Sequence, residues 1–459
     1  MKKFVLSSLI AALGFTAVSA QEIKPFTEGE RAVFLGNSIT DGGHYHSYIW
    51  LYYMTRFPDM PVMIYNGGIG GDTAFDMNKR LDNDIFSKNP TALMVTFGMN
   101  DSGYFEYNGD KAKEFGEQKY QESIRNYQEM EKRFKNLHDT RIVMVGTSPY
   151  DEGAQIEGNN FHGKNATIER IIAYQMESAK KNGWEHIDWN APMMELNRKA
   201  QQKDPSFTLC GTDRIHPDNH GHMVMAYLFL KAQGFAGKKV ADIDIDASSM
   251  KVVKEENCKI TNLKKNGKTI RFDYLANSLP YPLDTIPRGW MMSHPQSLAA
   301  DVVPFMEEMN QELLTVSGLS GKYRLLIDGE ELGVWSAKDF AKGINLAEIT
   351  WTPQYQQALA VMNLNERRWD IERSTREYAW CQHGFFQQEG LLNANNRKAI
   401  EAMDRGAKTN DWVKNHRNGY TATMHAPYRE AVQGEMDLLI DKIYEINKPV
   451  SHTIELRKL

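Results

Sequence analysis

The sequence predicts an α/β protein in which residues 27–240 form a mostly parallel sheet covered by helices. Two observations lead to this prediction. Short apolar runs alternate with longer helical patterns, which is the order expected of βαβ units. The runs are bounded by Gly, Pro or Asn and lack polar alternation, as is typical of strands buried on both faces. The pattern changes near residue 240, and residues 246–459 are predicted to be an additional mixed β and helical region.

Four apolar runs are predicted as strands, and a fifth candidate completes the sheet: 32–35, 62–65, 92–97, 141–146 and 184–188. Helical patterns lie between and after them at residues 48–57, 119–137, 165–182 and 219–233. The last helix has Pro217 near its start and Gly234 just past its end, residues that commonly flank a helix.

The second half divides into a β-rich part, residues 246–345, and a largely helical part, residues 352–448. The β predictions are two or three strands over 250–274 with a turn at Asn266-Gly267, a hairpin over 323–335 with a turn at Asp328-Gly329, and a last strand at 454–456. Six of the nine tryptophans lie in this half, at positions 290, 335, 351, 369, 380 and 412. A core role is the default for them, and some are candidates for a sugar-binding surface.

The composition is that of an ordinary globular protein, with 459 residues, 41% hydrophobic and 25% charged. Residues 1–20 are predicted to be a signal peptide, because Lys2 and Lys3 precede an apolar stretch that ends in Val18-Ser19-Ala20. We therefore expect an exported protein, periplasmic or secreted, whose formal net charge changes from −5 to −7 on cleavage. An acidic chain lacks the basic footprint of nucleic-acid binding, and no later apolar run is long enough to span a membrane. The oligomeric state stays open.

Three cysteines, Cys210, Cys258 and Cys381, are too few for a disulfide framework. One bridge with one leftover thiol is an option in an oxidising compartment. Cys210 lies near Asp213 in the sequence and is a candidate nucleophile, but a small buried apolar role is the simpler interpretation.

The segment around Ser38 carries the first chemical signal. The apolar run 33–35 ends at Gly36, and Ser38 follows two residues later, before Gly42 and Gly43. This order places a hydroxyl on the turn between a buried strand and a helix. In open α/β sheets, ligands bind at the carboxyl ends of the strands.

Three later blocks supply groups that a serine nucleophile needs. Asp213 and His216 offer a base and an orienting carboxylate within four residues. The glycine-rich residues 66–73 follow a predicted strand and offer backbone N–H groups, and Asn100 follows another strand with a side-chain amide. A turn, a cap or a surface contact explains each block alone, but their order, each after a predicted strand or near a closing helix, favours acyl transfer.

Together these blocks resemble the SGNH hydrolases, also called the GDSL esterase/lipase family, over about residues 30–235. The resemblance implies a three-layer, flavodoxin-like α/β/α sandwich and an ester hydrolase that needs no cofactor or metal. It implies a triad of Ser38, Asp213 and His216. It also implies an oxyanion hole formed by the N–H groups of Ser38 and Gly71 and the side chain of Asn100.

One position departs from the family pattern: Asn37 stands where the usual motif has Asp, and this position is not catalytic in the family. The segment also differs from the Gly-x-Ser-x-Gly elbow of α/β-hydrolases, because Thr40 occupies the last position. Among other candidates, the pairs His44/His46 and His220/His222 have metal-ligand spacing, but the sequence shows no Cys or carboxylate cluster that completes either set.

For the substrate, the resemblance and the export signal favour an acylated small molecule or polysaccharide, and we hypothesise a carbohydrate O-acetylesterase. Three alternatives remain. The first is an esterase or lysophospholipase for longer acyl chains, although no apolar lid stands out. The second is a glycan-binding protein on a hydrolase scaffold. The third is a glycosidase activity in the second half, for which no spacing singles out a pair among Asp370, Glu372, Glu377 and Glu389.

Overall fold

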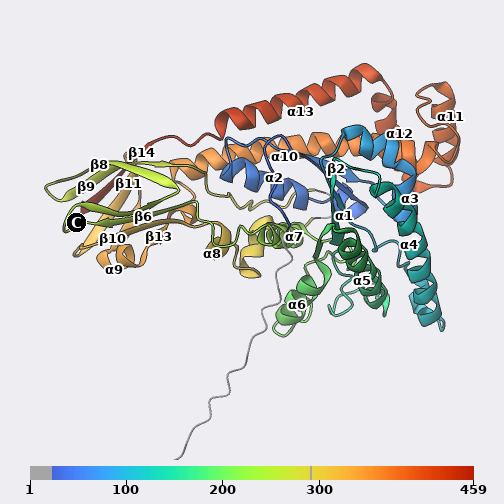
Figure 1. Cartoon of the computed structure of the whole chain (residues 1–459), viewed down its shortest axis with the longest axis horizontal. Helices are drawn as coiled ribbons and strands as arrows, with labels where there is room; N and C mark the ends of the chain where they lie inside the picture. Colours follow the sequence, from blue (N-terminus) through green and yellow to red (C-terminus); the bar gives the residue numbers. More distant parts are fainter. Residues whose placement is uncertain (1–22, 290–291) are drawn as a thin grey trace, which may run out of the picture.

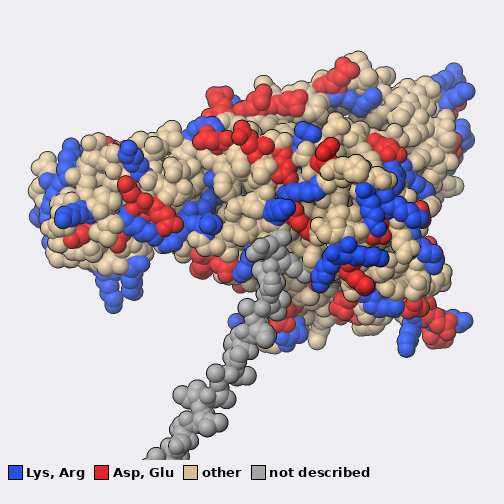
Figure 2. Space-filling model, viewed as in Figure 1, with Lys and Arg blue, Asp and Glu red and all other residues tan. Residues whose placement is uncertain are grey.

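The computed structural model describes residues 23–289 and 292–459 (Figure 1). The predicted signal peptide lies outside the described residues, and so does Trp290. Within the described part of the chain, no helix combines the length and the apolar character needed to cross a membrane. Lys and Arg side chains are mixed with Asp and Glu side chains over the face shown in Figure 2.

A five-stranded parallel sheet forms the centre of the first half, with the strand order β2-β1-β3-β4-β5. The strands are β1 Arg31–Gly36, β2 Met63–Gly68, β3 Ala92–Val95, β4 Arg141–Gly146 and β5 Glu185–Asp188. The strand order reverses beside β1, as in doubly wound sheets, where ligands bind outside the carboxyl ends of the strands. The predicted parallel sheet is therefore confirmed, including its fifth strand.

Helices cover both faces of this sheet, which gives the predicted three layers (Figure 1). On one face α2 contacts α7, and on the other α4 contacts both α3 and α5. The helices of this half are α1 Ser38–Asp41, α2 Tyr45–Arg56, α3 Ala74–Arg80, α4 Ala112–Phe134, α5 Lys164–Asn182, α6 Asn190–Gln201 and α7 Asn219–Ala232. The helices α3 and α6 were not predicted from the sequence pattern.

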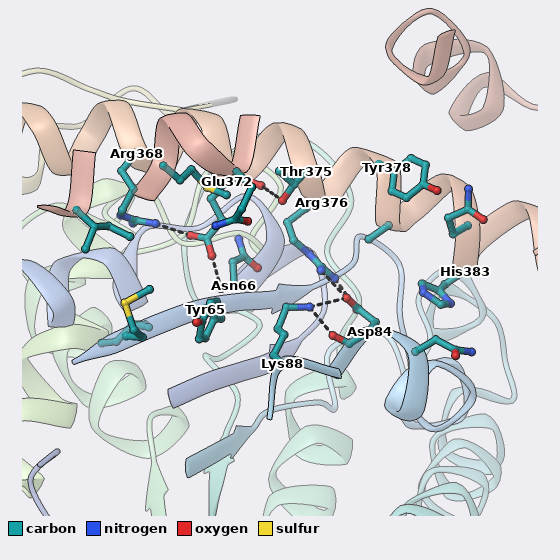
Figure 3. A pocket seen from close by; sticks show the side chains of 18 of the residues that line it. Tyr65, Asn66, Asp84, Lys88, Arg368, Glu372, Thr375, Arg376, Tyr378 and His383 are labelled. Carbon is teal, nitrogen blue, oxygen red and sulfur yellow. Dashed lines mark hydrogen bonds and ion pairs between the residues drawn. The ribbon is translucent and has the colours of Figure 1, made fainter. Parts of the chain in front are cut away.

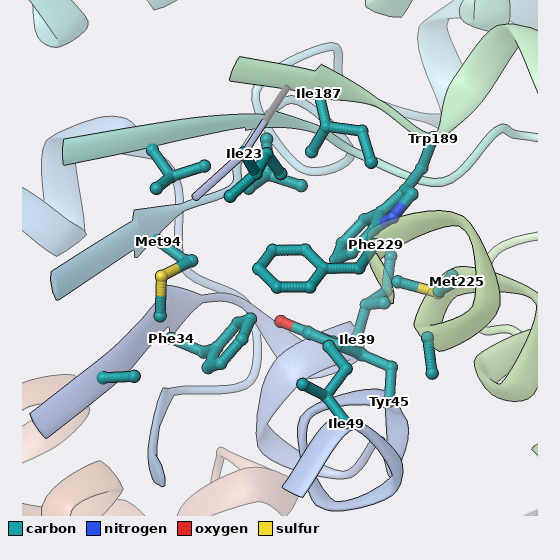
Figure 4. Packing of buried hydrophobic residues seen from close by; sticks show 14 of the residues in the cluster. Ile23, Phe34, Ile39, Tyr45, Ile49, Met94, Ile187, Trp189, Met225 and Phe229 are labelled. Atoms are coloured by element: carbon teal, nitrogen blue, oxygen red, sulfur yellow. The ribbon is translucent and has the colours of Figure 1, made fainter. Parts of the chain in front are cut away.

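The core between the sheet and the α2/α7 layer is aromatic (Figure 4). Phe34 of β1 lies against Phe229 of α7 with ring centroids 5.8 Å apart, and both side chains are buried. Burial of one such side chain contributes about 1.5–3 kcal/mol. This packing holds the end of β1, and with it the turn that carries Ser38.

One expectation needs correction at β2. Residues 66–73 were predicted to follow a strand, but Asn66, Gly67 and Gly68 form the end of β2 and pair with Phe34, Leu35 and Gly36. Glycine is required here because α1 approaches closely: a Cβ on Gly68 would lie 2.2 Å from Asp41 N. The free loop is therefore shorter, and we call residues 69–72 the glycine loop.

The β-rich part contains two sheets, of order β13-β10-β6-β7 and β12-β11-β14-β9-β8, that enclose a common apolar core. Their strands are β6 Ala241–Asp246, β7 Lys251–Glu256, β8 Cys258–Asn266, β9 Thr269–Ala276, β10 Glu312–Ser317, β11 Lys322–Ile327, β12 Glu330–Ser336, β13 Ile344–Asn345 and β14 His452–Lys458. The predicted turns at Asn266-Gly267 and Asp328-Gly329 join β8 to β9 and β11 to β12. The last strand, β14, returns between β11 and β9.

The second half also packs directly onto the hydrolase region. Tyr281, Phe305 and Met309 lie in the same core as Phe229, through the short helices η4 Gln296–Asp301 and α8 Phe305–Met309. The longest helix, α10 Pro353–Trp380, packs on α2, on β2 and on α13 Ala426–Ile446. The helices α11 Arg397–Gly406 and α12 Asp411–Thr423 follow α10, and α12 contacts it. Two further turns, α9 Ala337–Lys342 and η5 Leu346–Glu348, precede α10.

Candidate active site

Ser38 lies at the carboxyl end of β1, where the predicted turn was expected to place it. Asn37 caps the short helix α1, because its Oδ1 accepts a hydrogen bond of 3.0 Å from the N–H of Ile39. Asn37 therefore has a structural role in starting the helix.

The structure brings His216 and Asp213 to Ser38. His216 Nε2 lies 2.7 Å from Ser38 Oγ, and His216 Nδ1 lies 2.6 Å from Asp213 Oδ2. The other Asp213 oxygen accepts the backbone N–H groups of Ile215 and His216, at 2.9 and 3.0 Å. The three side chains thus form a continuous hydrogen-bonded line from a carboxylate to a hydroxyl.

The charge of Asp213 determines which ring nitrogen of His216 carries the proton. Burial raises the pKa of Asp213, but hydrogen bonds from His216 and Ile215 outweigh it, and the pKa lies below its ordinary value. The ionised carboxylate favours a proton on His216 Nδ1. His216 Nε2 is then the nitrogen that can accept a proton from Ser38.

Arg214 holds the turn between the carboxylate and the imidazole, a role that the sequence did not indicate. Its backbone φ is 65°, an uncommon value for a residue with a side chain. Its buried guanidinium donates to the carbonyls of Asp151, Ala154, Ile156 and Asn159. These hydrogen bonds stabilise the turn conformation in which Asp213 contacts His216.

The glycine loop and Asn100 lie together, although β1 separates the strands β2 and β3 that precede them. Asn100 Nδ2 donates a 2.9 Å hydrogen bond to the carbonyl of Asp72, and Tyr104 donates to Asn100 Oδ1 at 2.5 Å. An amide NH₂ has two donor hydrogens, so one remains for a ligand. Gly71 adopts φ 87°, which favours glycine. Asn100 itself lines a neighbouring cavity of about 220 Å³ with Thr73 and Phe75.

Ser38, Asp213 and His216 open into a cavity of about 450 Å³ that the second half helps to build. Helix α10 contributes Trp369, Arg373 and Glu377, and α12 contributes Trp412, Asn415 and His416. The sequence provided no means of choosing these residues. Tryptophan abundance in the second half was the only signal, and it did not separate Trp369 and Trp412 from core tryptophans.

The aromatic wall is held in place by specific contacts. Trp369 donates from Nε1 to the carbonyl of Gly43 at 3.0 Å and stacks on His44 at 3.8 Å. Trp412 is 53% exposed, and its ring approaches Gly70 so closely that a Cβ there would lie 3.3 Å away. Trp412 therefore offers an open aromatic face beside the glycine loop.

Charges on the cavity wall are unequal. Arg373 Nη1 lies 3.5 Å from Asp41 and 3.6 Å from Glu377, so one guanidinium faces two carboxylates. Asp41 Oδ2 in turn accepts the N–H of Gly70 at 3.2 Å. This part of the wall carries a net negative charge at neutral pH.

The histidine pairs are buried. Burial lowers the pKa of His46 to about 4 and that of His222 well below its ordinary value. The sequence showed no carboxylate that completes a histidine set, but Asp218 and His294 place ligand atoms within 4.8 Å of His220. Asp218 Oδ2 already accepts hydrogen bonds from Ser293 and His294, which ties their segment to α7 and accounts for this cluster without a metal.

The three cysteines are all free thiols. Burial raises the pKa of Cys210 well above its ordinary value, and its Sγ contacts the carbonyl of Pro149 at 3.6 Å. A buried protonated thiol is a poor nucleophile, which favours the packing role for Cys210.

Two family models match separate parts of the chain. Residues 34–224 match the model of the GDSL-like lipase/acylhydrolase family, and residues 359–448 match the diltiazem deacetylase C-terminal helical domain. A gut microbial diltiazem-metabolizing enzyme of known structure is 69% identical, with a TM-score of 0.95, and the match covers 96% of this chain and 100% of that one.

More distant relatives match less than half of this chain. An acetylxylan esterase of Geobacillus stearothermophilus is 24% identical over 226 residues, which are 45% of this chain and 95% of that protein. A crystal structure of an acetylxylan esterase from the same organism is 23% identical, with a TM-score of 0.36, over 46% of this chain and 96% of that one.

Proposed function

Because the chain belongs to the GDSL-like lipase/acylhydrolase family and is a carboxylic ester hydrolase, we propose that it removes acetyl groups from small aromatic esters such as diltiazem. One observation carries the proposal. The hydrogen-bonded Ser38, His216 and Asp213 open into a cavity whose far wall is aromatic and comes from α10 and α12. The full-length similarity to a diltiazem-metabolizing enzyme includes these helices.

In this proposal Ser38, His216 and Asp213 are a catalytic triad. Ser38 Oγ attacks the ester carbonyl carbon while His216 Nε2 takes its proton, and Asp213 stabilises the imidazolium that forms. Collapse of the tetrahedral intermediate expels the alcohol, which receives the proton from His216 and leaves an acetyl group on Ser38. Water then attacks this acetyl-enzyme with His216 as base, and acetate leaves as the proton returns to Ser38.

The oxyanion is held by the N–H groups of Ser38 and Gly71 and by the Asn100 side chain. The hydrogen bond from Asn100 to Asp72 fixes the position of the amide relative to the glycine loop. Donors that are fixed before the reaction lower the barrier because they need no reorganisation as charge develops.

The cavity supports an aromatic alcohol portion. Trp369 and Trp412 line the cavity, and aromatic pairs gain stability beyond the area that they bury. The negative charge shared by Asp41 and Glu377 around Arg373 favours a substrate with a basic group. Glu377→Gln is a direct way to remove that charge.

A polysaccharide O-acetylesterase is the second candidate. Two observations support it: the exposed ring face of Trp412, onto which the apolar face of a sugar can pack, and the similarity of the first half to an acetylxylan esterase. That relative matches 45% of this chain, whereas the similarity to the diltiazem-metabolizing enzyme covers 96% of it.

The test is to compare the hydrolysis of diltiazem, acetylated xylo-oligosaccharides and 4-nitrophenyl octanoate, with Ser38→Ala as the control. We expect Ser38-dependent release of acetate from diltiazem with the highest kcat/KM. A higher kcat/KM on the oligosaccharides would replace the proposal with the second candidate, and preference for octanoate would indicate a long-chain esterase.

Export is part of the proposal and is supported by the pattern of residues 1–20. Expression of the full chain in a bacterium, followed by N-terminal sequencing of the enzyme outside the cytoplasm, is expected to give Gln21 as the first residue. Recovery of the uncleaved chain from the cytoplasm alone would contradict export.

A further inference from the structure

A second cavity, of about 400 Å³, is lined by residues of α10 and β2 (Figure 3). Figure 3 shows buried charged side chains along it, with Arg368, Glu372 and Arg376 on α10 and Asp84 and Lys88 on the facing segment. The proposed mechanism uses none of these groups. Buried charges are costly, so their arrangement calls for an explanation.

Two of these side chains bind the backbone of the edge strand β2. Glu372 Oε1 accepts the N–H of Asn66 at 2.8 Å, and Arg376 Nε donates to the carbonyl of Gly68 at 2.9 Å. Arg368 holds Glu372 with a 2.7 Å hydrogen bond (Figure 3). Side chains of α10 thus take the place of a neighbouring strand at an edge that would otherwise stay unpaired.

Arg376 also starts a chain of buried ion pairs. Its two terminal nitrogens each lie 2.7 Å from an oxygen of Asp84, which is a bidentate pair. Asp84 Oδ2 accepts from Arg80 at 2.5 Å, and Arg80 Nε donates to Asp72 at 2.6 Å. Burial raises the pKa of Asp84, but Arg376, Lys88 and Arg80 outweigh it and hold the pKa well below its usual range.

This series of ion pairs ends at the two groups proposed to bind the oxyanion, the glycine loop and Asn100. Asp72 is the last residue of the glycine loop, and its carbonyl accepts the Asn100 amide. Arg80 Nη2 donates to the carbonyls of Gly36 and Gly67, at 3.1 and 2.8 Å. The guanidinium of Arg80 therefore joins the end of β1, the end of β2 and the glycine loop.

The glycine loop is also embedded in the helical part. Ile69 is buried in a core with Trp380, Phe386 and Tyr420. Gly70 lies beneath Trp412 on the other side. The helical part thus contacts the glycine loop, which contains the Gly71 N–H, through both apolar packing and ion pairs.

We propose that Arg376 is a positioning residue for the oxyanion hole: through Asp84 and Arg80 it fixes the glycine loop, and so makes the C-terminal helices part of the catalytic machinery. The inference rests on the proposed role of Gly71. A displacement of about 1 Å at a catalytic group costs about 10²-fold in rate. Arg376→Met is expected to lower kcat by about that factor while KM changes less than about threefold, because Arg376 is not among the residues that line the active-site cavity.

The matched control is Arg367→Met on the same helix, because Arg367 pairs with Glu435 in an exposed ion pair of 2.7 Å. Exposed pairs contribute little, so this variant is expected to keep the wild-type kcat. Arg376→Lys is the second variant: lysine keeps the charge but lacks the planar fork, and we expect an intermediate kcat. If Arg376→Met does not fold, the comparison is made with Arg376→Lys.

A direct readout separates positioning from general destabilisation. Sulfur is a weaker hydrogen-bond acceptor than oxygen, so a well-formed oxyanion hole favours an acetyl ester over its thionoester. We expect this preference to fall at least several-fold in Arg376→Met and to stay unchanged in Arg367→Met. An unchanged preference together with wild-type kcat in a folded Arg376→Met would overturn the inference.

Hydrogen exchange tests the inference even if the proposed function fails. Backbone amides of residues 69–72 are expected to exchange at least about tenfold faster in the Arg376 variant than in Arg367→Met, while residues 213–216 keep the wild-type rate. Equal exchange of residues 69–72 in both variants would overturn the inference. An enzyme without any acetyl esterase activity that still shows the faster exchange would overturn the proposed function alone.

Discussion

The catalytic trio and Gly70 of the glycine loop line the same cavity, but the trio and the loop are held by different parts of the chain. Ser38, His216 and Asp213 are held by hydrogen bonds made within the hydrolase region, including those of Arg214. The glycine loop also bonds to the hydrolase region, through Asn100 and Arg80, but Ile69 is packed in the apolar core of the helical part. Arg376 of α10 binds the adjoining Gly68 and, through Asp84, the Arg80 that pairs with Asp72. The difference teaches that the hydrogen bonds within the trio are independent of the second half. We expect transition-state stabilisation and substrate choice, in contrast, to depend on it.

The largest expected effect is a loss of kcat when the catalytic trio is changed. Asp213→Asn removes the charge that orients His216, and kcat on 4-nitrophenyl acetate is expected to fall about 10⁴-fold. Stopped assays of the purified variant measure this, with the exposed Asp204→Asn as control. A loss below tenfold would mean that Asp213 does not orient the base.

The next largest effect is expected for Asn100, which is hydrogen-bonded to the glycine loop. Asn100→Ala removes one oxyanion donor and the hydrogen bond to Asp72, so kcat is expected to fall about 10²–10³-fold with little change in KM. Steady-state kinetics with two acetyl esters check this. A loss under tenfold would argue against an oxyanion role for Asn100.

The ion pairs that join α10 to the glycine loop are also expected to contribute to the stability of the protein. Asp84→Asn leaves Arg376 and Arg80 without their shared carboxylate, and the free energy of unfolding is expected to fall by about 3 kcal/mol at pH 7. The folded pKa of Asp84 lies below its unfolded value of about 3.9, so its contribution is present above that pH and is lost as pH falls through the folded pKa. Urea unfolding at pH 7 and pH 3 is expected to show a smaller difference at pH 3. An equal difference at both pH values would contradict the role of the carboxylate charge.

The smallest effect is on substrate choice. Trp412→Ala is expected to raise KM for diltiazem about tenfold, because one aromatic contact is lost, and to leave methyl acetate hydrolysis within about twofold. The control is Trp351→Ala, since Trp351 is 73% exposed and lies between η5 and α10. Equal losses on both esters would show that Trp412 acts on the glycine loop rather than on the alcohol portion.

The sequence predicted the sheet well because its strands are short apolar runs between Gly, Pro and Asn, and all five lie close to the predicted positions. It also selected Ser38, Asp213 and His216, because each follows a recognisable strand end or precedes a helix. It could not predict the wall or Arg376. Arg376 is one charged residue on a helix rich in charges, and only the fold reveals that it faces Gly68 and Asp84 rather than solvent.

The same limit applies to packing. Tyr281 and Phe305 lie within a β-rich stretch of sequence yet pack in the hydrolase core, because the chain returns to α7 between β9 and β10. A division drawn along the sequence at residue 240 has no local signal for such a return.

The central claim is that this ester hydrolase acts through an acetyl group carried on Ser38. Rapid quenching of the enzyme with excess 4-nitrophenyl acetate, followed by peptide mass spectrometry, tests it most directly. We predict acetylation of the peptide that contains Ser38 and its loss in Ser38→Ala, which also loses turnover. An acetyl group found on another residue, or turnover retained by Ser38→Ala, would contradict the account.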